Sequence, residues 1–292
     1  MLATSIARAT TYADILHVCK SASHLVALTG AGVSTDSGIP DYRSPAGSYS
    51  KGHKPMTHDE FTMSLANRRR YWARSLAGYK PFASTLPNAA HHSLARLEQQ
   101  NVLQQLITQN VDGLHQRAGS SRVLELHGNT HSCTCMQCGA SESRARMQTR
   151  LQAYNHWLLR ESTASALSPA KMRADGDAEI GGVDDRFRVP ACEACGGVIK
   201  PDVVFFGDSV PAARATRAAE AVAQCDALLI VGTSLSTLSA FRLVEAVSRA
   251  GKPIALLNDG ETRAERAGLP GLLKLDARCG EVLARLADDI VN

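Results

Sequence analysis

Four of the eight cysteines form two Cys-x-x-Cys pairs, Cys135/Cys138 and Cys192/Cys195, and each pair is followed by glycine. Four thiolates suit a tetrahedral zinc ion, and such a site leaves no coordination position open for water, so the metal would be structural. The spacer of residues 139–191 is longer than the about 15–20 residues usual between such pairs, which predicts a helical insertion. A redox dithiol or two unrelated cysteine pairs are the alternatives.

The other four cysteines are not expected to bind this metal. Cys133 is separated from Cys135 by a single residue, which makes a poorer chelate, so we expect it in the core. Most of the remaining three, Cys19, Cys225 and Cys279, are expected to be small buried apolar side chains. We find no secretion signal, and therefore expect metal or redox use of the paired cysteines in place of a disulfide framework.

A second candidate site begins in residues 27–44, ALTGAGVSTDSGIPDYRS. The apolar start and Gly30-Ala31-Gly32 look like a dinucleotide-binding turn, but Thr35 stands where a hydride-transferring Rossmann enzyme has its third glycine. Pro40 prevents the segment from continuing as a plain helix. The pattern therefore indicates a dinucleotide site that is not built for hydride transfer.

Glycines and polar residues also follow the other apolar runs. Ligands of open parallel sheets bind at the carboxyl ends of the strands, where glycines let phosphates approach the backbone and helix N-termini supply N–H donors. Singly, the glycines could serve turns, His127 could be a structural hydrogen-bonding group, and Asn110 and Asp112 could cap a helix. Their convergence on one edge favours a nucleotide site made of Gly30, Ala31, Gly32, Gln109, Asn110, Val111, Asp112, His127, Gly232, Thr233, Ser234, Asn258, Asp259 and Gly260.

The elements that must position these residues can be predicted from the apolar pattern. Strands are expected at 24–30, 103–110, 123–128, 202–207, 227–234 and 253–258, and helices at 12–23, about 59–77, 88–100, 212–224 and 239–250. Strands and helices alternate at both ends of the chain, with a break between, which is typical of an α/β fold with a Rossmann-like parallel sheet and an inserted smaller domain. We predict that residues 1–44, 85–128 and 201–292 form the Rossmann-like domain. Residues 45–84 would form a helical module and 129–200 a zinc-binding module of the smaller domain.

The composition is compatible with this arrangement. The 292 residues are 44% hydrophobic, which is ample for a large core and one or two domains. The net charge of +4 is mild, so no specific nucleic-acid binding is expected. No apolar stretch approaches the about 18 residues that a membrane span requires. We expect a cytoplasmic protein without membrane partners, and a monomer.

Taken together, these residues resemble the sirtuin family of NAD-dependent protein deacylases and ADP-ribosyltransferases. The resemblance covers about residues 25–283. Its motifs are Gly30–Ser34, Ser37–Arg43, Thr108–His115, Glu125–Gly128, the two cysteine pairs, Lys200–Gly207 and Gly232–Leu235.

Within the family the chain resembles the class II group, which includes an animal mitochondrial lipoamidase and ADP-ribosyltransferase and bacterial relatives. The features that point to class II are Pro40–Ser44, Arg70–Arg74, the long zinc insertion and Val203–Asp208.

The resemblance implies how NAD would be bound. Residues Gly30 to Ser34 would cradle the pyrophosphate, and Asn110 and Asp112 would line the nicotinamide pocket and position the ribose and a water. The loop that closes over nicotinamide and ribose would contain Asp41, Tyr42 and Arg43. The family's contacts to the adenosine half of NAD match Gly232, Ser234, Asn258 and Cys279.

The resemblance also implies a reaction. The carbonyl oxygen of an acyl-lysine would attack C1′ as nicotinamide leaves, and His127 would act as general base on the ribose hydroxyls. We expect an unperturbed imidazole with a pKa of about 6.5 for this role. The 2′-hydroxyl would then attack the imidate carbon to give lysine, O-acyl-ADP-ribose and nicotinamide. Substrate backbone would pair with a strand that contains Val204, Phe205, Phe206 and Gly207.

Two features bear on substrate choice. The family often has a proline after a Ser-Leu-x-Val sequence, whereas this chain continues Leu235-Ser236-Thr237-Leu238-Ser239, which alters the rim of the peptide site. Tyr71 and Arg74 also resemble a pair that binds acidic acyl groups in one class of sirtuins, because a phenol and a guanidinium one helical turn apart could bind a carboxylate. The alternative is a surface helix of the small domain.

The sequence therefore predicts an NAD-dependent protein-lysine deacylase that uses NAD as co-substrate and holds one structural Zn²⁺. Mono-ADP-ribosylation of a protein side chain in the same pocket is the first alternative. A nucleotide-sensing module without turnover is the second, against which stands the joint presence of Asn110, Asp112 and His127. A hydride-transferring dehydrogenase is the third.

Overall fold

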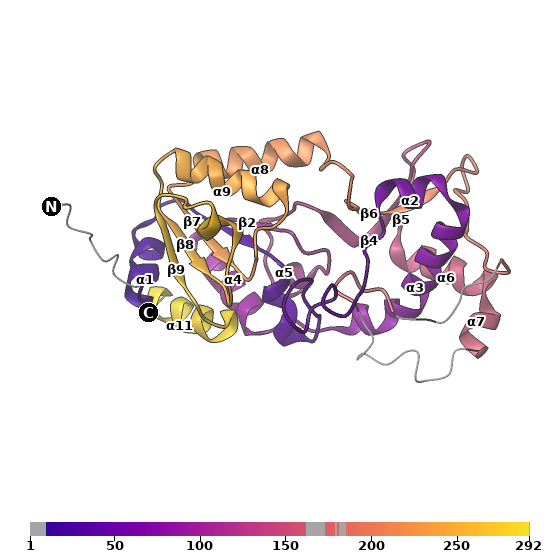
Figure 1. Cartoon of the computed structure of the whole chain (residues 1–292), viewed down its shortest axis with the longest axis horizontal. Helices are drawn as coiled ribbons and strands as arrows, with labels where there is room; N and C mark the ends of the chain where they lie inside the picture. Colours follow the sequence, from indigo (N-terminus) through magenta and orange to yellow (C-terminus); the bar gives the residue numbers. More distant parts are fainter. Residues whose placement is uncertain (1–9, 162–172, 179, 181–184, 292) are drawn as a thin grey trace.

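The computed structural model describes residues 10–161, 173–178, 180 and 185–291 of the chain. Figure 1 shows a larger part built around a parallel sheet and a smaller part at the other end of the long axis. None of the described helices is both long and apolar enough to cross a membrane.

The larger part contains a sheet that has six parallel strands among the described residues. Their order is β3-β2-β1-β7-β8-β9. The chain therefore builds outward from β1 in one direction and from β7 in the other, so the strand order reverses between these two neighbours. Open α/β sheets bind their ligands at such a switch point, beyond the carboxyl ends of the strands. The strands are β1 (Leu25–Thr29), β2 (Leu103–Thr108), β3 (Val123–Glu125), β7 (Ala227–Val231), β8 (Ile254–Leu257) and β9 (Leu272–Leu275).

Helices cover both faces of this sheet, which explains the uninterrupted apolar strands. Leu25 and Ala27 of β1 pack in one buried cluster with α1, α4 and α11, whereas Val26 and Leu28 pack in a second cluster with α8 and α9. The helices of this part are α1 (Tyr12–Ser21), the 3₁₀ helix η1 (Ala31–Ser37), α4 (Ala89–Gln99), α5 (Leu114–Arg117), α8 (Ala212–Gln224), α9 (Leu238–Arg249), α10 (Arg263–Arg266) and α11 (Cys279–Val291).

In the residues that the structure describes, the smaller part combines four helices with a three-stranded antiparallel sheet in the order β5-β4-β6. A separate core that includes Phe61, Trp72, Met147 and Phe187 holds it together. Its elements are α2 (His58–Met63), α3 (Leu65–Ser84), β4 (Gly128–Cys135), β5 (Ser141–Ser143), α6 (Arg144–Tyr154), α7 (His156–Glu161) and β6 (Ile199–Val203). Residues 162–172 of the predicted helical insertion lie outside the described residues.

The predicted α/β architecture with a second, smaller part is confirmed, and the predicted helix 212–224 matches α8. The expected continuous strand at 202–207 differs from the structure. The named strand there is β6, which ends at Val203, and it pairs antiparallel with β4, not with the parallel sheet. β6 also crosses the predicted boundary between residues 200 and 201. Two elements, β9 and α11, were not predicted from the sequence.

Candidate active site

Two glycine turns meet at the switch point between β1 and β7. The backbone N–H of Gly32 donates to the carbonyl of Gly232 over 2.8 Å. A Cβ on Gly32 would lie 2.8 Å from that oxygen, and a Cβ on Gly30 would lie 2.6 Å from Cβ of Thr233. Only glycine allows the two turns to come this close, and their backbone groups are left facing the crevice.

Gln109, directly after β2, connects the elements around this crevice. Its side-chain amide donates to the carbonyl of Thr29 over 3.2 Å and to Oγ1 of Thr233 over 2.9 Å. Its side-chain oxygen accepts from Oγ1 of Thr237, just before α9, over 3.0 Å. One side chain thus holds the ends of β1, β2 and β7 and the start of α9 in a fixed relation.

The buried Ser34 and Asp112 and the half-buried Asn110 form a polar chain beside Gln109. The hydroxyl of Ser34 donates to Oδ2 of Asp112 over 2.7 Å and accepts from Nδ2 of Asn110 over 3.1 Å. Burial raises the pKa of Asp112, while hydrogen bonds from the Leu114 backbone N–H and from Ser34 act in the opposite direction. The protein itself satisfies this carboxyl group, so the chain is held in place before any ligand binds.

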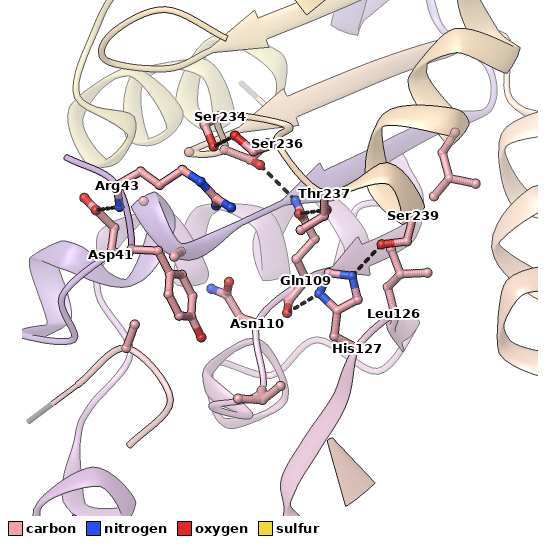
Figure 2. A pocket seen from close by; sticks show the side chains of 18 of the residues that line it. Asp41, Arg43, Gln109, Asn110, Leu126, His127, Ser234, Ser236, Thr237 and Ser239 are labelled. Carbon is pink, nitrogen blue, oxygen red and sulfur yellow. Dashed lines mark hydrogen bonds between the residues drawn. The ribbon is translucent and has the colours of Figure 1, made fainter. Parts of the chain in front are cut away.

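His127 follows β3 and faces the same cavity (Figure 2). Its Nδ1 lies 3.2 Å from the backbone carbonyl of Gln109, and its Nε2 lies 2.8 Å from Oγ of Ser239. Burial lowers the pKa of His127 to about 4; the bond to Gln109 opposes this shift and the charge of Arg214 adds to it. The expectation of an unperturbed imidazole was therefore wrong, because the sequence does not show how deeply the ring is desolvated.

The loop after η1 forms another wall. Oδ1 of Asp41 accepts from the backbone N–H groups of Arg43 and Ser44, both over 2.8 Å, which fixes the turn. Tyr42 packs on Tyr49 with ring centroids 5.5 Å apart, and the guanidinium of Arg43 lies over the same ring. Figure 2 shows the side chain of Arg43 extending across the cavity toward Gln109 and Asn110.

These groups surround a cavity of about 1650 Å³. The cavity also extends along α8 and α9, as far as Ala250 and Lys252, so its volume covers more than the space between these groups. Gly30 stands behind the described lining, against Thr233. The predicted residues that line the cavity are Ala31, Gly32, Ser34, Asp41, Tyr42, Arg43, Gln109, Asn110, Val111, Asp112, His127, Val204, Phe205, Phe206, Gly207, Gly232, Thr233, Ser234, Asn258, Asp259, Gly260 and Cys279.

The end of the cavity beside β8 contains Asn258 and Cys279. The amide of Asn258 donates within its own turn, to the carbonyls of Asp259 and Gly260 over 2.9 and 2.8 Å. Cys279 begins α11, and burial raises the pKa of its thiol to about 11. Both side chains therefore present neutral groups to a ligand at this end.

The segment after β6, Val204 to Gly207, also lines the cavity. The backbone N–H of Val204 donates to the carbonyl of His127 over 2.9 Å, which places this segment beside the imidazole. The carbonyl of Phe206 accepts from the backbone N–H of His58 over 2.9 Å, so α2 also supports it. Phe206 is 40% exposed and is available to a bound chain.

Tyr71 and Arg74 are not among the residues that line the cavity in the described part of the chain. Tyr71 is buried in the aromatic core of the smaller part, with its ring centroid 5.3 Å from that of Phe205. Burial and the charge of Arg173 lower the pKa of Arg74. Burial and the charge of Asp175 raise the pKa of the neighbouring Asp177, and the charges of Arg173 and Arg74 oppose this rise. This placement favours roles in packing and charge balance over recognition of an acyl group.

The structure brings Cys135, Cys138, Cys192 and Cys195 together at one end of the small sheet. Their four sulfur atoms all lie within 4.8 Å of one another, with Cys135 3.5 Å from Cys195 and Cys138 3.7 Å from Cys192. Four Zn–S bonds of about 2.3 Å in a tetrahedron place the sulfurs about 3.8 Å apart, so the cluster fits zinc. Cys133 is buried in the neighbouring core and outside the cluster.

Ser239 and Thr237 contribute to the site, although they were not predicted as site residues. Both come from the stretch that departs from the family's proline pattern, and this departure was the available signal. Their partners, His127 and Gln109, are more than a hundred positions away in the sequence. The tertiary structure brings them together by placing the start of α9 beside the residues that follow β2 and β3.

Comparison with known proteins agrees with this geometry. The family described as the Sir2 family matches residues 30–239. The chain is 49% identical to "NAD-dependent protein deacylase SRT2" of Arabidopsis thaliana, over 92% of this chain and 74% of the relative. It is 48% identical to an "NAD-dependent protein deacetylase" of Xanthomonas campestris, over 90% of this chain and 86% of the relative. It is 43% identical to "NAD-dependent protein deacylase Sirt4" of Drosophila melanogaster, over 92% of this chain and 84% of the relative.

Solved structures are similar over nearly the whole chain. A Sir2 protein with a deacetylated p53 peptide and 3′-O-acetyl ADP-ribose superposes with a TM-score of 0.75 at 28% identity, covering 96% of this chain and 98% of that one. A Sir2 complex with a p53 peptide and NAD⁺ gives a TM-score of 0.72 at 28% identity, with the same coverage.

Proposed function

The chain belongs to the Sir2 family, and from this premise we propose that it is an NAD-dependent protein-lysine deacylase. The observation that carries the proposal is the convergence of His127, Asn110 and Asp112 on one cavity with the paired glycine turns. The similarity to a Drosophila relative named Sirt4 supports placement in class II.

NAD would bind along the carboxyl ends of the strands. The turn from Gly30 to Ser34 and the turn of Gly232, Thr233 and Ser234 would receive the pyrophosphate, because their backbones approach the crevice without side chains in the way. The adenosine half would extend toward Asn258, Asp259, Gly260 and Cys279. The nicotinamide half would lie between the Asp41–Arg43 loop and the Ser34–Asn110–Asp112 chain, which would orient the ribose and nicotinamide.

The acyl-lysine would enter from the side of Val204 to Gly207 and pair with this segment. Its carbonyl oxygen would bond to C1′ of the ribose as nicotinamide leaves. His127 would then accept the proton lost by a ribose hydroxyl when that hydroxyl attacks the imidate carbon. Because burial lowers its pKa to about 4, the imidazole is neutral and able to accept a proton throughout the range near pH 7.

We also propose that the four cysteines hold one zinc ion with a structural role. All four ligand positions are filled by thiolates, so the ion would have no open position for chemistry. It would instead close the small sheet by joining the turn after β4 to the turn before β6.

Protein mono-ADP-ribosylation in the same cavity is the alternative, because the step that releases nicotinamide is common to both reactions. No feature of the cavity favours it over deacylation. The two are separated by their products, O-acyl-ADP-ribose or an ADP-ribosylated protein.

The test is mass spectrometry of a peptide library that carries acetyl, butyryl, succinyl, glutaryl, hydroxymethylglutaryl, lipoyl and myristoyl lysine. Each peptide is incubated with NAD and either the wild type or His127→Ala. We expect at least one acyl group to be removed, with O-acyl-ADP-ribose formed about 10²- to 10⁴-fold more slowly by the variant. Release of nicotinamide with every acyl group retained would contradict deacylation and favour ADP-ribosyl transfer.

A further inference from the structure

Both ring nitrogens of His127 are already engaged. Nδ1 lies 3.2 Å from the carbonyl oxygen of Gln109, and a carbonyl can only accept, so the proton of the neutral ring is on Nδ1. Nε2 therefore carries the lone pair, and Oγ of Ser239 lies 2.8 Å from it. The hydroxyl of Ser239 must donate this hydrogen bond. Nε2 of His127, the basic nitrogen of the proposed general base, is thus hydrogen-bonded to the hydroxyl of Ser239 and does not face the open cavity directly.

Ser239 is placed so that its oxygen can also meet a substrate. It lines the cavity, is only half-buried, and lies in the first turn of α9. Figure 2 shows its hydroxyl and the His127 ring pointing toward one another. After donating to Nε2, the oxygen keeps two lone pairs with which it can accept a hydrogen bond from a substrate hydroxyl.

We propose that Ser239 is a proton relay between the ribose hydroxyl of the substrate and Nε2 of His127. This inference rests on the proposed deacylase function. It assigns a role to a residue in the stretch where the chain departs from the family's common proline pattern. It also explains how a base with both nitrogens bonded can still take up a proton.

The proton transfer accompanies the attack of the ribose hydroxyl on the imidate carbon. A lone pair of the ribose oxygen forms the new bond to the imidate carbon, and the π electron pair of that carbon–nitrogen bond moves to the lysine nitrogen. The ribose proton passes to Oγ of Ser239 as the serine's own proton passes to Nε2 of His127. Ser239 ends as a neutral hydroxyl and His127 as an imidazolium, whose Nδ1–H still donates to the Gln109 carbonyl.

The position of Ser239 on α9 assists this transfer. The helix is 12 residues long, and the positive end of its dipole lies at the turn that carries the serine. Negative charge that develops on Oγ while the two protons move is stabilised there. A serine in the middle or at the end of the helix would lack this stabilisation.

The experiment compares the wild type with Ser239→Ala, Ser239→Thr and Ser239→Val. Threonine and valine have the same shape and differ only in that threonine keeps the hydroxyl, so this pair separates the proton path from packing. Two rates are measured with one acylated peptide found to be a substrate: formation of O-acyl-ADP-ribose, and exchange of labelled nicotinamide into NAD. Exchange reports the step before any ribose proton is removed, and thermal melting checks that each variant is folded.

We expect kcat for O-acyl-ADP-ribose formation to fall about 10- to 100-fold in Ser239→Ala and Ser239→Val and to return to within a few-fold of the wild type in Ser239→Thr. Nicotinamide exchange should persist in all three. A wild-type kcat in Ser239→Val would overturn the relay. An equal loss of nicotinamide exchange and of O-acyl-ADP-ribose formation in both Ser239→Thr and Ser239→Val would also overturn it. If the wild type itself forms no O-acyl-ADP-ribose with any acyl-peptide, the proposed function fails and the relay with it.

Discussion

The four-cysteine cluster and the cavity around His127 hold their polar groups in opposite ways. The cluster draws its ligands from two short turns, and each turn sets the spacing of two cysteines locally. The cavity draws its groups from the ends of five strands, and hydrogen bonds such as those of Gln109 and Ser34 hold them in place. If the cluster holds the proposed zinc ion, its stability would depend on that ion, whereas the protein alone organises the cavity.

The largest effect should follow from removal of the metal, by a strong chelator or by Cys192→Ser. Structural zinc supplies up to about 10–16 kcal/mol of folding free energy in small modules, so the smaller part should lose its cooperative unfolding transition. Metal content by plasma mass spectrometry and thermal unfolding by circular dichroism would show this.

Cys133→Ala is the matched control for that experiment. Cys133 is buried two positions before Cys135 but outside the cluster, so this variant should keep one metal ion per chain. An unchanged metal content and melting temperature in Cys192→Ser would show that the cluster is not a structural metal site.

The next largest effect should come from Gly128→Ala, at the junction between the two regions. Gly128 has φ +82, and a Cβ there would lie 1.9 Å from the carbonyl oxygen of Asp202. We expect a loss of more than about 3 kcal/mol in the free energy of unfolding, because strain and a backbone clash combine. Gly38→Ala is the control: its φ is +88 with nothing within 4 Å, so only about 1–2 kcal/mol should be lost. Equal losses in a denaturant titration would refute this explanation.

The pH dependence of kcat/KM tests how the protein environment alters His127. Burial lowers its pKa to about 4, so the neutral base persists as the pH falls and is lost only near pH 4. Between pH 7.5 and 5.5 we expect kcat/KM to change by less than about twofold, whereas a base with a pKa of about 6.5 would lose about tenfold. An acid limb centred near pH 6.5 that is absent from the His127→Ala profile would contradict the buried, neutral ring.

The smallest effect on activity should come from Arg74→Ala. Because Arg74 does not line the cavity, the ratio of succinyl- to acetyl-peptide turnover should stay within about twofold of the wild type. The free energy of unfolding should change by less than about 1 kcal/mol, because the attraction of Arg74 to Asp177 is offset by burial and by the charge of Arg173. A selective loss of succinyl-peptide turnover would restore the acyl-recognition hypothesis for this residue.

Much of the site could be predicted because short-range chemistry specifies it. Cysteine spacing identifies the four thiolates that the structure brings together, and apolar runs ending in glycine or polar residues identify the strand-end part of the cavity lining. The assignment of Tyr71 and Arg74 to a substrate site had no such support. A helical spacing of three residues says only that two side chains share a face, not which neighbour that face meets.

The amino-acid sequence alone determined the α/β class, the two cysteine pairs and the polar residues at the strand ends, because these follow from local periodicity, turn chemistry and residue type. The catalytic roles of Asn110, Asp112 and His127 were implied by the resemblance to the sirtuin family. Tertiary structure decided the antiparallel pairing of β6 with β4, the lowered pKa of His127 and the contact between His127 and Ser239. Each of these depends on residues far apart in the chain and on how much water their packing excludes. Neither the identity of the distant partner residues nor the amount of water that their packing excludes can be read from the pattern of neighbouring residues.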